Sequence, residues 1–269
     1  RRALETISGT TSPIFQSAVM REVVRTVERI APSDVTVLIT GESGTGKEVI
    51  ADLLHAFSPR SKGKIVKINC AALPRELIES ELFGSVRGAF TGAHTDREGL
   101  FRQAEGGTLL LDEISEMPID TQSKLLRVLQ DQEVRPVGGK TTYKTNCRLI
   151  AATNRKTDEA IAQGKLREDL FYRISAISVH LPPLRDRRED IMPMANSFLK
   201  RFSAQANRVI KGFTPSAAER LTAFDWPGNV RQLQNEVQRA VLLSEGEEVD
   251  ASDLSISQAK VSGEDSPDT

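Results

Sequence analysis

A glycine-rich stretch that ends in a lysine runs through residues 41–47 (Gly-Glu-Ser-Gly-Thr-Gly-Lys). Glycines let backbone N–H groups turn inward around a phosphate, and the N-terminus of a following helix adds positive partial charge. Lys47 supplies a point charge for the β- and γ-phosphates of a nucleotide. A strand-like run precedes the stretch and a helical pattern follows it. This context favours a nucleotide-binding loop over an ordinary glycine-rich turn.

Position 48 departs from the usual form of such a loop. The residue after the lysine is commonly Ser or Thr, whose hydroxyl binds Mg²⁺. Here it is Glu48. A magnesium ion would therefore depend on phosphate oxygens, water and a carboxylate from another part of the chain.

Such a carboxylate follows the apolar run 108–111, which ends in Asp112 and Glu113. In P-loop enzymes an Asp at this strand end holds Mg²⁺, and the adjacent Glu can polarise the attacking water. An ordinary strand capped by polar residues is the alternative. Because a nucleotide switch does not need the second acid, the pair predicts hydrolysis.

Two asparagines end other strand-like runs. Asn154 follows residues 151–153, where a polar tip would lie beside the γ-phosphate and orient water or sense the product. Asn69 closes the run 65–68 and is placed to hydrogen-bond Glu113 and hold it away from the water. Both residues are also explained as ordinary strand-end caps, and the residue types alone leave the two interpretations open.

Three arginines are candidates for phosphate contacts. Arg167 and Arg173 are six positions apart, which on a helix turns through about 240°, so the two do not share a face. One arrangement sends one or both across a subunit boundary to a neighbour's phosphate. Arg231 follows a predicted helix start, with Asn229 as N-cap and Gln232 completing a pair that resembles a capping box. An arginine in the first turn opposes the helix dipole, which indicates that it faces an anion.

A second glycine-flanked stretch covers residues 88–93 (Gly-Ala-Phe-Thr-Gly-Ala). Its pattern is typical of a mobile loop that carries an exposed aromatic at its tip. Since Phe is usually buried, a turn that tucks Phe90 inward fits the residues equally well.

These residues need elements to position them, and the sequence alternates between strand and helix patterns. Five short apolar runs are typical of strands, and they cover residues 35–40, 65–68, 108–111, 148–152 and 176–181. Helix-like stretches lie between them, for example at residues 48–57, 75–83 and 121–130. This alternation predicts an α/β domain with a parallel sheet over residues 1–183.

The pattern changes after residue 183. Residues 188–243 show no convincing strand, and their apolar residues recur at helical spacing, with breaks that divide the region into three or four short helices. We therefore expect a small all-helical domain over residues 184–244. Residues 245–269 are acidic and Ser-rich, which predicts a linker or tail.

The composition sets limits on function. The chain has 269 residues, of which 39% are hydrophobic and 27% charged, as in soluble globular proteins. A net charge of -1 and an aromatic content of 5% argue against a surface for nucleic acid in this part of the protein. Cys70 and Cys147 lack the spacing of metal ligands. No secretory or membrane-spanning run is present, which predicts a cytoplasmic protein, and the start at Arg1 predicts a fragment of a longer one.

Three motifs together resemble the AAA+ central domain of sigma-54-dependent transcription activators, also called bacterial enhancer-binding proteins. The motifs are residues 41–48 (Gly-Glu-Ser-Gly-Thr-Gly-Lys-Glu), 88–93 and 226–233 (Trp-Pro-Gly-Asn-Val-Arg-Gln-Leu). The resemblance covers about residues 12–245, and Glu48 is usual in this family. It implies a P-loop ATPase with a five-stranded parallel sheet flanked by helices and a small C-terminal helical lid.

The resemblance also implies roles for residues. Asp112 would bind Mg²⁺, Glu113 would activate water with Asn69 as its switch partner, and Asn154 and Arg231 would be sensors I and II. Arg167 and Arg173 would be arginine fingers that act in trans. The ATP-binding residues would be Gly41, Glu42, Ser43, Gly44, Thr45, Gly46, Lys47, Glu48, Asp112 and Arg231. The loop that contacts sigma-54 would comprise Gly88, Ala89, Phe90, Thr91, Gly92 and Ala93, and residues 140–146 would form a second pore loop.

The implied activity is ATP hydrolysis with Mg²⁺ by a ring of six or seven subunits, which opens the closed promoter complex of RNA polymerase holoenzyme carrying sigma-54. Promoter DNA would be bound by a separate domain, within a two-component system. A different remodelling ATPase would need another pore loop in place of residues 88–93. A module that binds ATP without turnover would not need the pair of acids.

Overall fold

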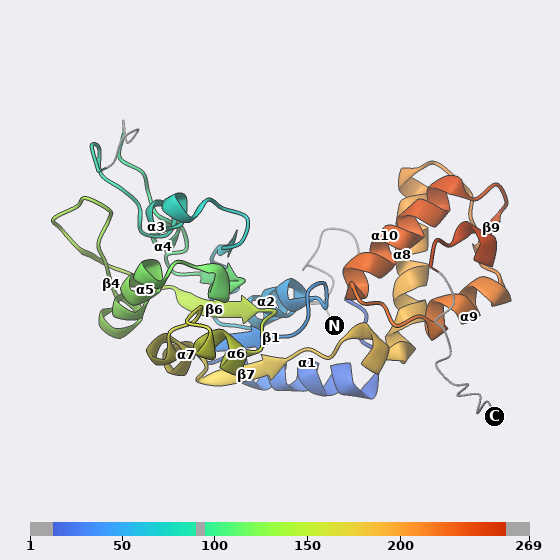
Figure 1. Cartoon of the computed structure of the whole chain (residues 1–269), viewed down its shortest axis with the longest axis horizontal. Helices are drawn as coiled ribbons and strands as arrows, with labels where there is room; N and C mark the ends of the chain where they lie inside the picture. The colour runs from blue at the N-terminus through green and yellow to red at the C-terminus, as the bar shows by residue number, and fades with distance from the viewer. Residues whose placement is uncertain (1–12, 90–94, 257–269) are drawn as a thin grey trace, which may run out of the picture. The chain divides into compact units, whose positions relative to one another are not determined.

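The computed structural model describes residues 13–89 and 95–256. The chain folds into two compact units (Figure 1). Within the described residues, the first unit comprises Pro13, Arg21–Glu42 and Gly46–Leu181. The second comprises Ile14–Met20, Ser43–Thr45 and the chain from Pro182 onward. The sequence predicts an α/β domain over residues 1–183, whereas Ile14–Met20 and Ser43–Thr45 belong to the second unit.

The first unit is built around a parallel sheet with the strand order β2-β3-β6-β1-β7. Its strands are β1 (Val37–Thr40), β2 (Ile65–Asn69), β3 (Thr108–Asp112), β6 (Arg148–Thr153) and β7 (Ile177–His180). The five predicted strands are confirmed, with ends that differ by one or two residues. Every residue of β6 is buried, as expected for a central parallel strand covered on both faces.

The parallel arrangement brings the ends of these strands to one edge of the sheet. Asn69 is in register with Asp112, and Thr40 is in register with Thr153. The glycine-rich loop follows Thr40, and Glu113 and Asn154 follow the ends of β3 and β6. Residues that are far apart in the sequence are therefore grouped at the carboxyl edge, where open α/β sheets bind ligands.

Helices and a short hairpin complete the first unit. The helices are α1 (Ala18–Ile30), whose first three residues belong to the second unit, α2 (Lys47–Ala56), α3 (Arg75–Phe83), α4 (Leu100–Gln103), α5 (Ile119–Asp131), α6 (Thr157–Ala162) and α7 (Glu168–Ile174). A 3-10 turn, η1 (Ile114–Glu116), follows β3, and β4 (Glu133–Val134) pairs antiparallel with β5 (Tyr143–Lys144). The core contains fully buried Leu38, Leu109, Leu125 and Leu170, so the apolar faces of the helices hold the sheet in place.

The second unit is mainly helical. It contains α8 (Ile191–Gln205), α9 (Pro215–Ala223), α10 (Asn229–Leu243) and the 3-10 turns η2 (Leu184–Asp186), η3 (Arg188–Asp190) and η4 (Ala251–Asp253). Helices α8 and α10 lie side by side (Figure 1). Fully buried Trp226 stacks edge-on against Phe224 and donates its ring N–H to the carbonyl of Leu221 at 2.9 Å. The indole thus fills the core with its polar group satisfied.

The predicted helical lid is confirmed, with one addition and one correction. In addition to its helices, the unit contains a short parallel pairing of β8 (Gly212–Phe213) with β9 (Glu248–Val249). Residues 245–256 are not a tail, because Val249, Leu254 and Ile256 are buried in the core of the second unit. These three apolar side chains, together with the β8–β9 pairing, help to hold the segment in place, a contribution that average composition does not reveal.

No helix within residues 13–89 and 95–256 is long and apolar enough to cross a membrane.

Candidate functional site

The glycine-rich loop has the backbone that its sequence predicts. Gly46, the N-cap of α2, has φ 103, and Gly44 has φ 77. Residues other than glycine rarely adopt these backbone angles. A Cβ on Gly44 would also lie 2.5 Å from the carbonyl oxygen of Gly228, which belongs to the same unit. The loop therefore needs glycine at both positions, and its last residues lead directly into the N-terminus of α2, a favourable place for phosphate.

Lys47 lies inside the loop that it terminates. Its Nζ donates to the carbonyl oxygens of Gly41 at 3.0 Å and Glu42 at 3.3 Å. It also lies 3.6 Å from Oε1 of Glu113, and both side chains are largely buried, with exposures of 7% and 12%. One ammonium group thus connects the loop with the acidic end of β3, and low exposure strengthens this attraction.

Glu113 has a backbone conformation that is rare for its residue type. Its φ of 53 and ψ of 51 are left-handed, and it forms the N-cap of η1. Side chains held in such conformations cluster at functional sites, where the surrounding structure supports the strain. The preceding Asp112 ends β3 and accepts a hydrogen bond from the backbone N–H of Glu113 at 3.1 Å. The two adjacent carboxylates therefore have separate surroundings, as two different roles require.

The end of β6 holds the turn that follows β3 through three contacts. The backbone N–H of Asn154 donates to Oε2 of Glu113 at 3.0 Å. The hydroxyls of Thr153 and Ser115 hydrogen-bond at 3.1 Å. Beyond them, Nε of Arg155 donates to Oε1 of Glu116 at 2.7 Å. The backbone of Asn154 therefore lies beside Glu113, and the role of its side chain beside the γ-phosphate stays a prediction.

Asn69 has a different partner from the predicted one. Its Nδ2 donates to Oδ2 of Asp112 at 3.3 Å, whereas the sequence predicts a hydrogen bond to Glu113. The reason is the register, which places Asn69 directly opposite Asp112. Glu113 turns away into the left-handed conformation and towards Asn154.

Glu48 points to a lysine that sequence reasoning missed. Nζ of Lys67 lies 2.8 Å from Oε1 of Glu48 and 2.7 Å from Oδ1 of Asp52. Burial lowers the pKa of Lys67, but the bonds to Asp52 and Glu48 outweigh it and raise the pKa above the usual value. The side chain of Glu48 is thus paired with Lys67, and contact of Glu48 with ATP stays a prediction. The signal was a single charged residue inside the apolar run 65–68, on the same face of the strand as Asn69.

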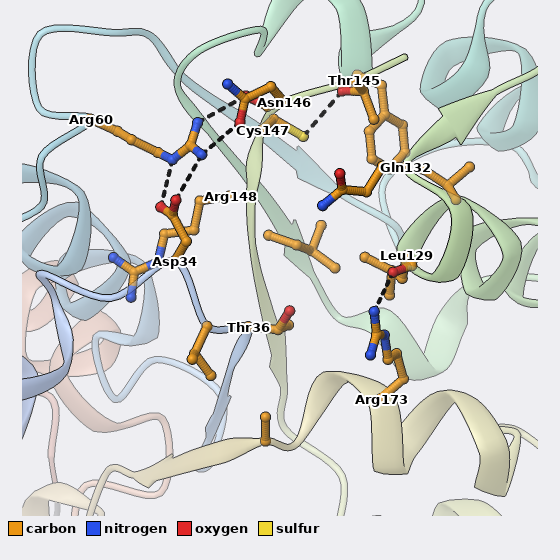
Figure 2. A pocket seen from close by; sticks show the side chains of 15 residues that line it. Asp34, Thr36, Arg60, Leu129, Gln132, Thr145, Asn146, Cys147, Arg148 and Arg173 are labelled. Atoms are coloured by element: carbon orange, nitrogen blue, oxygen red, sulfur yellow. Dashed lines mark hydrogen bonds and ion pairs between the residues drawn. The ribbon is translucent and has the colours of Figure 1, made fainter. Parts of the chain in front are cut away.

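The two predicted arginine fingers bond to the helices α5 and α7. Arg167 is the N-cap of α7 rather than a helical residue, and it pairs with both carboxylate oxygens of Asp169 at 3.0 and 2.7 Å. Arg173, in the last turn of α7, donates to the carbonyl oxygen of Leu129 at 2.5 Å (Figure 2). The hydrogen bonds of the two side chains therefore go to Asp169 in α7 and to Leu129 in α5.

Arg173 lines a cleft of about 380 Å³ at the opposite edge of the sheet. The lining includes Asp34 and Thr36, which precede β1, and Arg148, which starts β6 (Figure 2). The length of β1 therefore separates this cleft from the loop that follows Thr40, roughly 13 Å for four residues. Arg173 is on the wrong side of the sheet to reach a phosphate held by its own chain.

Arg231 belongs to the second unit, together with residues 43–45. Its Nη1 donates to the hydroxyl of Ser43 at 3.1 Å, and the side chain of Asn229 donates to the carbonyl of Ser43 at 3.0 Å. Asn229 is not the N-cap of α10 as predicted, because Gly228 takes that position. Gln232 does accept a hydrogen bond from the N–H of Gly228 at 2.9 Å. Arg231 thus contacts the loop segment that its predicted role requires.

The described part of the 88–93 stretch is its start. Gly88 and Ala89 are described, whereas Phe90, Thr91, Gly92 and Ala93 lie outside the described residues. Before the stretch, Ser85 bridges to Arg97 and to Val137. A Cβ on Gly138 would lie 2.7 Å from Cβ of Ala89. The segment around Val137 and Gly138, just before predicted residues 140–146, therefore packs directly against the base of the stretch.

The carboxylates at the sheet edge fit a magnesium ion whose other ligands are phosphate oxygens. Among the residues that the structure describes, no group of three or more His, Cys, Asp or Glu side chains could hold a metal. Magnesium usually binds one or two carboxylates, with phosphate and water as its other ligands. Asp112 provides a carboxylate of this kind at the end of β3.

Two family models match the chain. The Sigma-54 interaction domain matches residues 14–180, and the AAA+ ATPase lid domain matches residues 185–268. These matches confirm the resemblance that three short motifs predicted.

Similar proteins cover nearly the whole chain. It is 52% identical to the regulatory protein AtoC of Escherichia coli (strain K12) over 241 residues, which are 90% of this chain and 52% of AtoC. It is 47% identical to the DNA-binding transcriptional regulator NtrC of Salmonella typhimurium over 266 residues, 99% of this chain and 57% of that protein. A crystal structure of NtrX from Brucella abortus in complex with ATP superimposes with a TM-score of 0.83 at 40% identity, over 90% of this chain and 54% of that one.

The chain spans about half the length of the curated relatives it matches. The two family matches indicate the same family as the glycine-rich loop and the carboxylates at the sheet edge. This chain belongs to the Sigma-54 interaction domain family and continues into an AAA+ ATPase lid domain.

Proposed function

We propose that this chain is the ATP-hydrolysing motor domain of a sigma-54-dependent transcription activator. The observation that carries the proposal is the 3.6 Å approach of Nζ of Lys47 to Oε1 of Glu113. Lys47, proposed to bind phosphate, and Glu113, proposed to activate water, are thereby next to each other. The crystal structure of the relative NtrX in complex with ATP supports ATP as the nucleotide.

In the proposed reaction Glu113 is the general base. A water oxygen forms a bond to the γ-phosphorus, while the bond from that phosphorus to the oxygen bridging the β- and γ-phosphates breaks. The water proton passes to Glu113, and the bridging oxygen leaves as part of ADP. The N–H of Asn154 holds the carboxylate at 3.0 Å and so orients the base. Lys47 and the N-terminus of α2 stabilise negative charge on the phosphates.

The metal site is part of the same proposal. Asp112 would hold Mg²⁺, and the amide of Asn69 at 3.3 Å would orient this carboxylate. When bound, the ion would neutralise charge on the phosphate oxygens. The carboxylate of Glu48 is proposed to pair with Lys67, at 2.8 Å, rather than to bind the ion.

The arginines are proposed to act in a ring. Arg173 lies at the amino edge of the sheet, so its guanidinium serves a phosphate only when the phosphate belongs to a neighbouring subunit. Arg167 is proposed to act with it as a finger in trans, and Arg231 to contact the nucleotide of its own chain as sensor II. A closed ring of six or seven subunits satisfies this requirement, since a head-to-tail interface that closes leaves no site incomplete.

The partner is proposed to be sigma-54 in RNA polymerase holoenzyme. The match to the Sigma-54 interaction domain over residues 14–180 supports this partner. Contact would come from residues 88–93, with residues 140–146 as the second pore loop. The relatives named as DNA-binding regulators support promoter binding by a domain outside this chain. We infer that the protein works in the cytoplasm, where RNA polymerase acts.

One experiment tests the proposal as a whole. Purified chain would be assayed for phosphate release from ATP with Mg²⁺, and then for open-complex formation by sigma-54 RNA polymerase on a premelted and a duplex promoter. We expect hydrolysis, and ATP-dependent opening of the duplex promoter. ATP binding without turnover would contradict the motor and favour a nucleotide-dependent binding module.

A further inference from the structure

Two charged residues beside the proposed base have no role in the reaction described so far. Arg155 follows Asn154 directly, and Glu116 ends the 3-10 turn that starts after Glu113. Nε and Nη2 of Arg155 lie 2.7 and 2.5 Å from the same oxygen, Oε1 of Glu116. The two side chains are 34% and 28% exposed. An isolated surface ion pair with this exposure would contribute little to the stability of the fold. Any functional effect of the pair must therefore come from the segment that it holds in position.

The pair holds the strained turn that carries Glu113. The carbonyl of Glu113 accepts a hydrogen bond from the N–H of Glu116 at 2.9 Å, which closes the turn. The backbone of Glu113 is left-handed, a conformation that a glutamate keeps only when its surroundings impose it. Movement of Glu116 would therefore be transmitted to Glu113 through a short, rigid segment.

The turn is fixed to β6 at three successive positions. The first contact joins the N–H of Asn154 to Glu113, and the second joins the buried hydroxyls of Thr153 and Ser115 at 3.1 Å. The ion pair of Arg155 with Glu116 is the third and outermost contact. Without it, the hydrogen bond between the hydroxyls of Thr153 and Ser115 would be the contact nearest to the end of the turn, and this neutral bond is weaker than a charge-assisted one.

We infer that Arg155 is a positioning residue for Glu113, and that it acts by holding Glu116 and thus the direction of the proposed base. The inference rests on the proposed function, since it assigns a task to a residue beside the proposed base. Arg155 itself is not expected to touch the nucleotide. Its effect should appear in the rate of the chemical step rather than in the affinity for ATP.

The test is steady-state ATP hydrolysis by the full chain, at a protein concentration where activity per subunit no longer rises. The variants are Arg155→Gln, Glu116→Gln and the exchange Arg155→Glu with Glu116→Arg. Each single variant should lower kcat on the order of tenfold, because small displacements of a catalytic group are costly. KM and the thermal midpoint should stay near their original values. The exchange should recover most of kcat, since it restores the ion pair with opposite polarity.

A matched control is Lys156→Gln. Lys156 is adjacent to Arg155 in the sequence and pairs with Glu159 at 3.0 Å, away from the turn. This variant should hydrolyse ATP at the original rate. In a Glu113→Gln background, Arg155→Gln should cause no further loss, because both changes act through one carboxylate.

Three results would overturn the inference. Arg155→Gln could keep kcat within about twofold while Glu113→Gln is slow, which would leave the proposed base intact and the pair a simple surface contact. Arg155→Gln could raise KM as much as it lowers kcat, which would place Arg155 on the nucleotide. Normal turnover in Glu113→Gln would remove the base itself, and with it both the proposed function and this inference.

Discussion

The backbone N–H of Asn154 donates a hydrogen bond to Oε2 of Glu113 at 3.0 Å. A backbone donor has little freedom of its own, so it fixes the carboxylate relative to the central strand β6. The same carboxylate lies 3.6 Å from Nζ of Lys47. Glu113 is thus oriented by an ammonium group at the start of α2 and by a backbone N–H that directly follows β6.

Replacing Glu113 tests its role as the general base. Glu113→Gln keeps the shape of the side chain but removes its basicity, so ATP should still bind while turnover falls at least ~100-fold. Binding can be measured with a fluorescent ATP analogue and turnover by phosphate release. Glu159→Gln, an exposed glutamate on α6, should remain active. Near-normal turnover by Glu113→Gln would refute the assignment.

Magnesium dependence separates the roles of Asp112 and Glu48. Asp112→Asn should raise the Mg²⁺ concentration for half-maximal activity at least ~10-fold, because it weakens the proposed carboxylate ligand. Glu48→Gln should leave this concentration unchanged within about twofold, since the side chain of Glu48 contacts Lys67. A large shift with Glu48→Gln would show that Glu48 reaches the metal.

Subunit mixing tests whether Arg173 acts in trans. Activity per subunit should rise with protein concentration as rings form, with particle mass measured by light scattering. Arg173→Ala and Glu113→Gln should each be nearly inactive alone. When they are mixed, about one quarter of randomly formed interfaces would combine an intact Glu113 with an intact Arg173, and hydrolysis should partly return. Activity that is flat from dilute to concentrated protein would exclude this arrangement.

The 88–93 stretch is expected to bind sigma-54. Thr91→Ala should weaken binding to sigma-54 at least ~10-fold in the presence of ADP and aluminium fluoride, without changing the thermal midpoint. Open-complex formation should be lost with it. Thr95→Ala, an exposed position just beyond the stretch, is the matched control. If Thr91→Ala retained sigma-54 binding and promoter opening, the contact would have to lie elsewhere.

The C-terminal segment is expected to contribute to stability. Leu254 is 6% exposed in the core of the second unit, and the carboxylate of Glu236 accepts from the backbone N–H and the hydroxyl of Ser255 at 2.5 and 2.6 Å. Leu254→Ala should lower the free energy of unfolding by about 2–5 kcal/mol in urea titrations. Glu247→Ala, at an exposed position of the same segment, should change it by less than about 0.5 kcal/mol. If the two variants changed the free energy of unfolding equally, the segment would be a tail that does not contribute to the core.

Local patterns were sufficient for the main features of this protein. The five parallel strands, the glycine-rich loop with Lys47 and the pair Asp112–Glu113 are all contiguous in the sequence. The apolar pattern of a strand and the need for glycine at positive φ are both set within a few consecutive residues. These features can therefore be recognised in the sequence without knowing the fold. The family resemblance also came from three short motifs.

Partners between distant residues were decided only by the tertiary structure. Glu48 contacts Lys67, Asn69 contacts Asp112 instead of Glu113, and Arg173 lies at the edge of the sheet opposite the phosphate loop. Each of these depends on strand order and register, and the order β2-β3-β6-β1-β7 does not follow the order of the chain. Residues 245–256 were misjudged for a related reason, because a few buried side chains stabilise a segment whose average composition is polar. Packing is a property of the contacts that a side chain makes in three dimensions, and those contacts are not encoded by its neighbours in the sequence.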